Sequence, residues 1–210
     1  MTTVQWTAND FDVFTIDGLE PRMAALIERV RPKFQTLGET FSNYFSVALD
    51  EEFFAHVAKH ARRTVNPPHD SWVAFAPNKR GYKAMPHFQI GLFESHLFIN
   101  LAVIYEAPNK DEMAERLLNN EALFAQLPQN FYVSGDHMSP TTQNIDEALN
   151  AGDVEKLLKR LQNVKKGEFI VGRTLSREEA VALSPEAFDQ VVEQTFDALL
   201  PIYKTMLNRA

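Results

Sequence analysis

The residues best suited to chemistry lie in one segment of this 210-residue chain, residues 56–83 (HVAKHARRTVNPPHDSWVAFAPNKRGYK). The segment has six lysines and arginines and a single acid, Asp70, whereas the whole chain has a formal charge of −7. Positive charge concentrated within an acidic protein is typical of a surface that faces an anion. The six cations are Lys59, Arg62, Arg63, Lys79, Arg80 and Lys83.

Phosphate is the anion that this set of side chains suits best. Arginine offers a planar fork for bidentate contacts to phosphate oxygens, and lysine adds a point charge. Trp72 and Tyr82 provide flat rings on which a nucleotide base can stack. The chain has only eight glycines, which disfavours a backbone cradle, so side chains are expected to hold the phosphate. His56, His60 and Asn66 are counted with the predicted ligand contacts.

The spacing of the apolar residues predicts a helix over about 50–63. On that helix His56, Lys59, His60 and Arg63 would share one face, because spacings of three and four stack side chains. The turn Asn66-Pro67-Pro68 would end it, and NKRGYK would form a loop between two strands. Helix and loop flank the same short strand, so we expect both to reach one edge of the sheet. A solvated polar face is the competing interpretation.

Three residues are candidates for acid–base chemistry: His60, His87 and Asp70. Alternation over 86–93 places His87 and Gln89 on the polar side of a strand, with Gly91 leaving space above it. A histidine on that face would be a natural proton carrier near pH 7. The competing interpretations are a hydrogen-bonded structural histidine and, for Asp70, a loop cap or an ion pair with Arg62 or Arg63, which is the interpretation we prefer for Asp70.

No metal and no cofactor are predicted. His56 and His60 have the i, i+4 spacing of a two-histidine metal site, but HVAKH lacks the glutamate of such motifs and the neighbouring cations would repel a metal ion. His137 follows Asp136 in an isolated Asp-His pair, for which we expect a structural role. The sequence has no nucleophile elbow, Walker A motif or dinucleotide fingerprint.

Helices are predicted in the N-terminal third and again towards the C-terminus. Thr7 is a helix cap, and Pro32 should split the helix that opens near Pro21. Two capping boxes, Asn109–Glu112 and Ser176–Glu179, indicate further helix starts. The remaining predicted helices cover about 154–161 and 184–208.

Strands are predicted in a separate run. Those over 71–76, 86–93 and 97–106 form an antiparallel meander, and 131–134 and 168–174 are further candidates. Segregated strands and helices predict an α+β fold, in which an antiparallel sheet is packed with helices in two layers. Without linkers or repeats, residues 1–210 are expected to form a single domain, with the C-terminal helix packed on it.

Composition excludes several classes of protein. The absence of cysteine rules out disulfides, cysteine-ligated zinc and thiol nucleophiles. The longest apolar run, near 97–105, is too short to span a bilayer, and the N-terminus lacks the pattern of a signal peptide. We therefore expect a cytoplasmic protein with no membrane partner. The net charge disfavours a protein that coats nucleic acid, although a local phosphate site remains compatible with it.

Several motifs resemble one protein family. HVAKHARRTVNPPHDSWVAF and NKRGYKAMPHFQIGLFE, together with FDVFTIDGLEPRM, IYEAP, the GDH of residues 135–137 and LQNVKK, are similar to the YktB-like family of uncharacterised bacterial proteins. The resemblance covers nearly the whole chain and implies a cytosolic single-domain α+β protein. It implies no activity and no catalytic residues.

Three functional hypotheses follow from these residues. The leading one is a binding site for a phosphorylated small molecule, a nucleotide or a short nucleic-acid segment. The second is an enzyme acting on such a substrate with a histidine as acid or base. The third is an interaction module whose basic face binds an acidic protein, which includes self-association through the acidic remainder of the chain.

Overall fold

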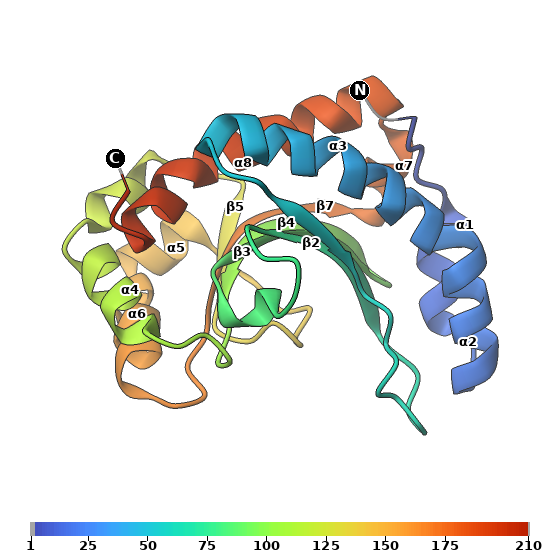
Figure 1. The fold of residues 1–210 in the computed structure, drawn as a ribbon, viewed down its shortest axis with the longest axis horizontal. Coiled ribbons are helices and arrows are strands. Elements are labelled where there is room, and N and C mark those ends of the chain that lie inside the picture. The colour runs from blue at the N-terminus through green and yellow to red at the C-terminus, as the bar shows by residue number, and fades with distance from the viewer. Residues whose placement is uncertain (1–2, 210) are drawn as a thin grey trace. The chain divides into compact units, whose positions relative to one another are not determined.

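The computed structural model describes residues 3–209, and its strands belong to one seven-stranded sheet (Figure 1). Hydrogen-bonded neighbours follow the order β1-β2-β3-β4-β7-β5-β6. The pairs β1–β2, β5–β6 and β5–β7 are antiparallel. The strands are β1 Phe54–Val57, β2 Asp70–Ala76, β3 His87–Phe93, β4 His96–Val103, β5 Phe131–Ser134, β6 Gln143–Asn144 and β7 Phe169–Ser176. The predicted α+β class and the meander of the central strands are confirmed.

Helices account for most of the remaining chain. The α-helices are α1 Ala8–Asp12, α2 Leu19–Ala25, α3 Arg31–Leu49, α4 Lys110–Leu118, α5 Ile145–Asn150, α6 Asp153–Asn163, α7 Arg177–Ala182 and α8 Pro185–Met206. A π-helical turn, Leu26–Val30, separates α2 from α3. Short 3₁₀ segments occupy Val13–Thr15, Tyr82–Ala84 and Glu121–Gln126. No helix among residues 3–209 is long and apolar enough to cross a membrane.

Helix starts follow the predicted caps with one exception. Thr7 and Ser176 both form capping boxes, with Asp10 and Glu179 respectively. Pro32 lies in the first turn of α3, where its missing N–H costs no hydrogen bond. The predicted box at Asn109 is wrong. Asn109 adopts a left-handed conformation with φ 54° and caps nothing with its side chain.

Contacts between Cα atoms divide the chain into two compact units. The first comprises the residues up to Arg80 together with Gln89–Phe98 and Leu175–Val192. The second comprises Gly81–Phe88, Ile99–Thr174 and the residues from Glu193 onward. The single domain over residues 1–210 stays a prediction.

Aromatic side chains fill the core of the first unit. Phe41 and Phe45 of α3 lie against Phe75 of β2, with ring centroids 6.3 and 5.4 Å from it. Helix α3 thereby covers one face of β1 and β2 (Figure 1). Trp6 fills the other end of α3, with its ring 5.8 Å from that of Phe34. Burial of such large apolar rings is the main stabilising contribution to this unit.

The second unit has its own core, and within it strands β4 and β7 approach each other closely at Gly172. Phe88 packs against Phe196 and Tyr203 of α8, with centroids 5.5 and 5.0 Å apart. In the sheet, Tyr132 pairs opposite Gly172, and its hydroxyl accepts a 3.0 Å hydrogen bond from Asn100 Nδ2. A Cβ atom on Gly172 would lie 2.2 Å from the Ile99 carbonyl oxygen, so only glycine fits between these neighbours.

Candidate functional site

The basic segment does not form the predicted helix. Asp50 ends α3 in a left-handed conformation, and the chain returns as strand β1 beside β2. The apolar residues that looked helical, Phe54 and Val57, instead pair with Ala76 and Val73. Residues 58–69 follow β1 as an irregular loop, here called the cationic loop, in which His60 has φ 52°. The prediction of a helix over 50–63 is therefore wrong, because pairing with β2 overrides local spacing.

His56 and His60, the two histidines predicted to share a helix face, make structural contacts. His56 Nε2 lies 2.8 Å from the carbonyl oxygen of Asn78. Burial lowers the pKa of His56, and the hydrogen bond to the Asn78 carbonyl oxygen only partly offsets that effect. His60 Nε2 lies 3.2 Å from Ser71 Oγ, and its ring meets that of Trp72 edge-on at 5.6 Å. The two histidines do not share a helix face, so the i, i+4 metal geometry is not formed.

The cations of the segment lie at two ends of β2. Lys59, Arg62 and Arg63 belong to the cationic loop, which leads into the first residue of β2. Lys79 and Arg80 follow its last residue, and Lys79 Nζ lies 5.1 Å from the centre of the Phe54 ring. A strand rises about 3.3 Å per residue, so roughly 20 Å of β2 separates the two groups. The expected single surface of helix and loop is therefore divided in two.

None of these five cations forms an ion pair with an acid among residues 3–209. Lys59, Arg62, Lys79 and Arg80 are exposed, and the Arg63 guanidinium only donates a 3.4 Å hydrogen bond to the Asn66 carbonyl. No ion pair joins Asp70 to Arg62 or Arg63 in the described part of the chain, and the preferred structural role of Asp70 stays a prediction. Asp70 is the first residue of β2 and is only 2 % exposed.

His87 and Gln89, which were predicted to lie on the polar side of their strand, are both buried. His87 is fully buried: its Nδ1 lies 2.8 Å from the Met85 carbonyl oxygen, and the Tyr82 ring meets it edge-on at 4.9 Å. Lys83 lies 3.6 Å from Glu106, and it is the one cation of the segment with an acidic partner among residues 3–209.

The open space expected above Gly91 is filled. A Cβ atom at this position would lie 2.1 Å from Cζ of Phe98. The Phe98 ring of the neighbouring strand therefore covers the glycine. Gly91 serves close packing, and the prediction that it leaves room for a ligand is wrong.

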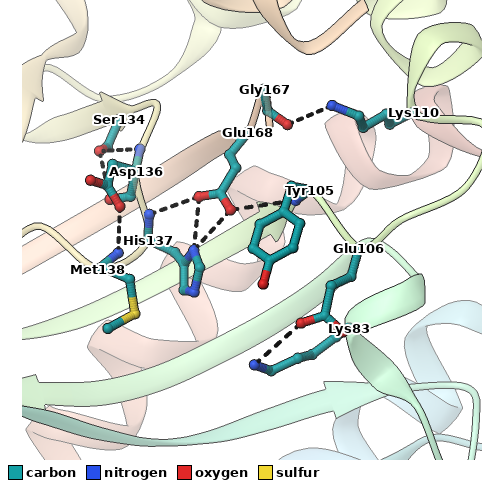
Figure 2. A network of polar contacts seen from close by, with 10 residues as sticks. All are labelled: Lys83, Tyr105, Glu106, Lys110, Ser134, Asp136, His137, Met138, Gly167 and Glu168. Carbon is teal, nitrogen blue, oxygen red and sulfur yellow. Dashed lines mark hydrogen bonds and ion pairs between the residues drawn. The ribbon is translucent and has the colours of Figure 1, made fainter. Parts of the chain in front are cut away.

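A polar network in the second unit joins β7 to the loop after β5 (Figure 2). Glu168, just before β7, is 4 % exposed, and its carboxylate accepts hydrogen bonds from three donors. The His137 Nδ1 lies 2.8 and 3.0 Å from its two oxygens, the His137 backbone N–H donates at 3.0 Å, and the Tyr105 N–H donates at 3.4 Å. Burial by itself raises the pKa of Glu168, but these hydrogen bonds outweigh it and hold that pKa below its ordinary value.

The partner of His137 is therefore Glu168, and not the adjacent Asp136. The Asp136 carboxylate accepts the backbone N–H of Met138 at 2.8 Å, as aspartates in turns commonly do. Ligand atoms of Asp136, His137 and Glu168 lie within 4.8 Å of one another, a spacing that also suits a divalent cation. The prediction that the protein binds no metal stays a prediction.

Sequence reasoning singled out His137 but missed Glu168 and Tyr105. Glu168 is 31 residues away, so no local motif connects the pair. One signal was present: an acid begins an otherwise apolar strand, where a buried carboxylate needs donors. Tyr105, whose ring centroid lies 6.4 Å from that of His137, carried no signal beyond its place at the end of a strand.

Comparison with known proteins gives consistent matches along the chain. The family model described as "Domain of unknown function (DUF1054)" matches residues 6–203. A protein named UPF0637 from Lysinibacillus sphaericus is 59% identical over 209 residues, which cover 100% of this chain and 99% of that protein. UPF0637 proteins from Exiguobacterium sibiricum and Macrococcus caseolyticus are 50% and 47% identical, covering 96% and 97% of this chain and 98% and 100% of theirs.

Proposed function

We propose that this chain, which belongs to the DUF1054 family of bacterial UPF0637 proteins, binds a phosphate-bearing small molecule or nucleotide at its cationic loop. The membership confirms the resemblance to YktB-like proteins seen in the motifs. The names of these relatives state no ligand or reaction, so the proposal depends on the charges and positions of this chain's own residues.

One observation carries the proposal: the three cations of the cationic loop lie close together without an acidic partner among residues 3–209, whereas five cations outside the basic segment have one. Lys156 pairs with Asp153, Lys159 with Glu155, and Arg177 with Asp12. Three cations within five residues, Lys59, Arg62 and Arg63, have no such partner among residues 3–209. Their mutual repulsion persists in the folded protein, and a bound phosphate would relieve it.

The surroundings of the loop favour a nucleotide within this class. Trp72 lies at the base of the cationic loop, half-buried, with the His60 ring edge-on against it. A base could stack on the accessible part of the indole while the phosphates lie between the arginines. An extended nucleic acid is less favoured, because the remainder of the chain is strongly acidic.

Isothermal titration with ATP and with pyrophosphate at low salt tests the proposal. R62Q/R63Q should weaken binding roughly tenfold or more, since a hydrogen bond to a charged group contributes about 1.5–3 kcal/mol. K165Q/K166Q is the matched control, because it removes two exposed cations outside the basic segment. K79Q/R80Q should have a smaller effect than R62Q/R63Q.

Two results would contradict the proposal. The first is the absence of binding to either phosphate compound at low salt. The second is an equal loss of affinity in R62Q/R63Q and in the Lys165/Lys166 control, which would mean that only net charge matters. A loss confined to K79Q/R80Q would place the site at the other end of β2 and reject the cationic loop.

A further inference from the structure

A second site lies in the other unit, where Glu168 fixes the orientation of His137 (Figure 2). A carboxylate can only accept hydrogen bonds unless it is protonated, and Glu168 is held in its charged form by three N–H donors. The proton between the two groups therefore belongs to His137 Nδ1. In the neutral imidazole this leaves the lone pair on Nε2.

The Nε2 atom is available to a ligand. It has no hydrogen-bond partner among residues 3–209, and the His137 side chain is 17 % exposed. The hydrogen bonds from the His137 backbone N–H and from Nδ1 both end on the same buried carboxylate. The imidazole ring is thus held at Nδ1 by Glu168, while Nε2 remains accessible.

We propose that His137 Nε2 is a proton-accepting group for a bound water molecule or an uncharged, hydroxyl-bearing ligand, and that Glu168 is its positioning residue. In the proton transfer, the ligand O–H bond breaks and a new N–H bond forms at Nε2. The electron pair stays on the ligand oxygen, which becomes a nucleophile. The resulting imidazolium lies 2.8 Å from the Glu168 carboxylate, which stabilises its positive charge.

The charges around His137 favour an uncharged ligand over an anionic one. The charged groups around the site are Lys83, Lys110 and Arg160 against Glu106, Asp111, Asp136 and Glu168. Carboxylates outnumber cations, so an anion has no advantage here, in contrast to the cationic loop. Tyr105 is 48 % exposed beside the imidazole, and its ring provides a flat apolar face for a hydroxylated ligand.

Nitrogen-15 correlation spectra of the wild-type imidazoles test the geometry directly. We expect the proton of neutral His137 on Nδ1 and an unprotonated Nε2, with H137Q used to assign the signals. A neutral ring protonated on Nε2 would overturn the proposal. This measurement needs no variant of Glu168, so it holds even if replacing that buried residue impairs folding.

Acylation by diethyl pyrocarbonate, followed by mass spectrometry, tests whether Nε2 is accessible and nucleophilic. His137 should react roughly tenfold faster than the fully buried His87, and E168Q should slow it several-fold. E193Q, which removes an exposed carboxylate of α8, should leave the rate unchanged. A rate for His137 as slow as that of His87 would contradict an accessible Nε2, and equal effects of E168Q and E193Q would contradict positioning by Glu168.

Adding phosphate or a divalent metal ion distinguishes the proposed site from an anion site and from a cation site. Inorganic phosphate should leave the His137 signals unchanged, and a specific shift would reject an uncharged ligand. Stoichiometric Mn²⁺ or Zn²⁺ should neither broaden nor shift them. Saturable broadening that is lost in D136N would assign the cluster to a cation and overturn the proposal.

Discussion

At the scale of single residues, Gly172 is the position that tolerates least change. Its neighbours include the backbone oxygen of Ile99, which cannot rotate away from an added methyl group. Gly91 differs, because its close neighbour is the ring of Phe98, a side chain that can shift. The two glycines therefore distinguish a backbone constraint from a packing constraint.

We expect G172A to lower the free energy of unfolding by about 2–3 kcal/mol, in the range of overpacked cores. G91A should cost less, because the Phe98 ring can move aside. Denaturant unfolding of both variants measures the difference. Equal costs would show that strands β4 and β7 separate more easily than their close approach implies.

The pH dependence of stability should also be visible at one residue, His96. Burial lowers its pKa below the ordinary value of 6.5, so the unfolded chain binds the proton more tightly. The free energy of unfolding should therefore fall as the pH drops below about 6.5. Unfolding at pH 7.5 and 5.5 should show a smaller fall in H96Q than in the wild type. H69Q, which removes an exposed imidazole, serves as the control.

At the scale of elements, the short helix α7 depends on its cap. Ser176 Oγ accepts the Glu179 N–H at 3.1 Å, and Glu179 Oε2 accepts the Ser176 N–H at 2.7 Å. A six-residue helix has few internal hydrogen bonds, so these two contribute a large share of its stability.

Replacing the cap residue should measurably lower the free energy of unfolding. S176A should destabilise the protein by about 1 kcal/mol, the usual cost of losing such a side chain. E179Q keeps an acceptor at the same place and should cost less. Chemical denaturation of the two variants compares them, and an equal loss in both would argue against the reciprocal box.

Elements with a local signal were predictable from sequence, and those that depend on a distant partner were not. The caps at Thr7 and Ser176 and the alternation in β3 depend on neighbouring residues. Strand β1 was mistaken for a helix because the three-residue spacing of Phe54 and Val57 is typical of a helix, and pairing with β2 overrides that local signal. Glu168 was missed for the same reason, since its partner His137 lies in another loop.

At the scale of the whole molecule, the charge distribution limits which phosphates can bind. The chain has a net charge of −7, whereas its basic segment is positive. Screening confines the field of that segment to about 8 Å at physiological ionic strength. A small phosphate compound can lie within this range, but a long duplex would also meet the acidic remainder.

Duplex DNA should therefore not bind measurably at physiological salt, while a small phosphate ligand still does. Fluorescence anisotropy with a labelled 30-base-pair duplex at about 0.15 M salt tests this expectation, because affinity for a polyanion falls steeply with salt. Tight binding of the duplex under these conditions would contradict the prediction, because it would require an extended basic surface that the acidic residues do not oppose.

The edge position of β1 gives the basic segment a second consequence, for solubility. β1 is the outermost strand on its side of the sheet, so its outer backbone groups have no strand partner there. Such an edge can pair with the same edge of another copy, and natural proteins oppose this with charge. Lys59 and Lys79 follow the two ends of the short β1–β2 ladder, so two approaching copies would repel each other. Neutralising these lysines would remove this repulsion and make edge-to-edge aggregation easier, whatever the segment binds.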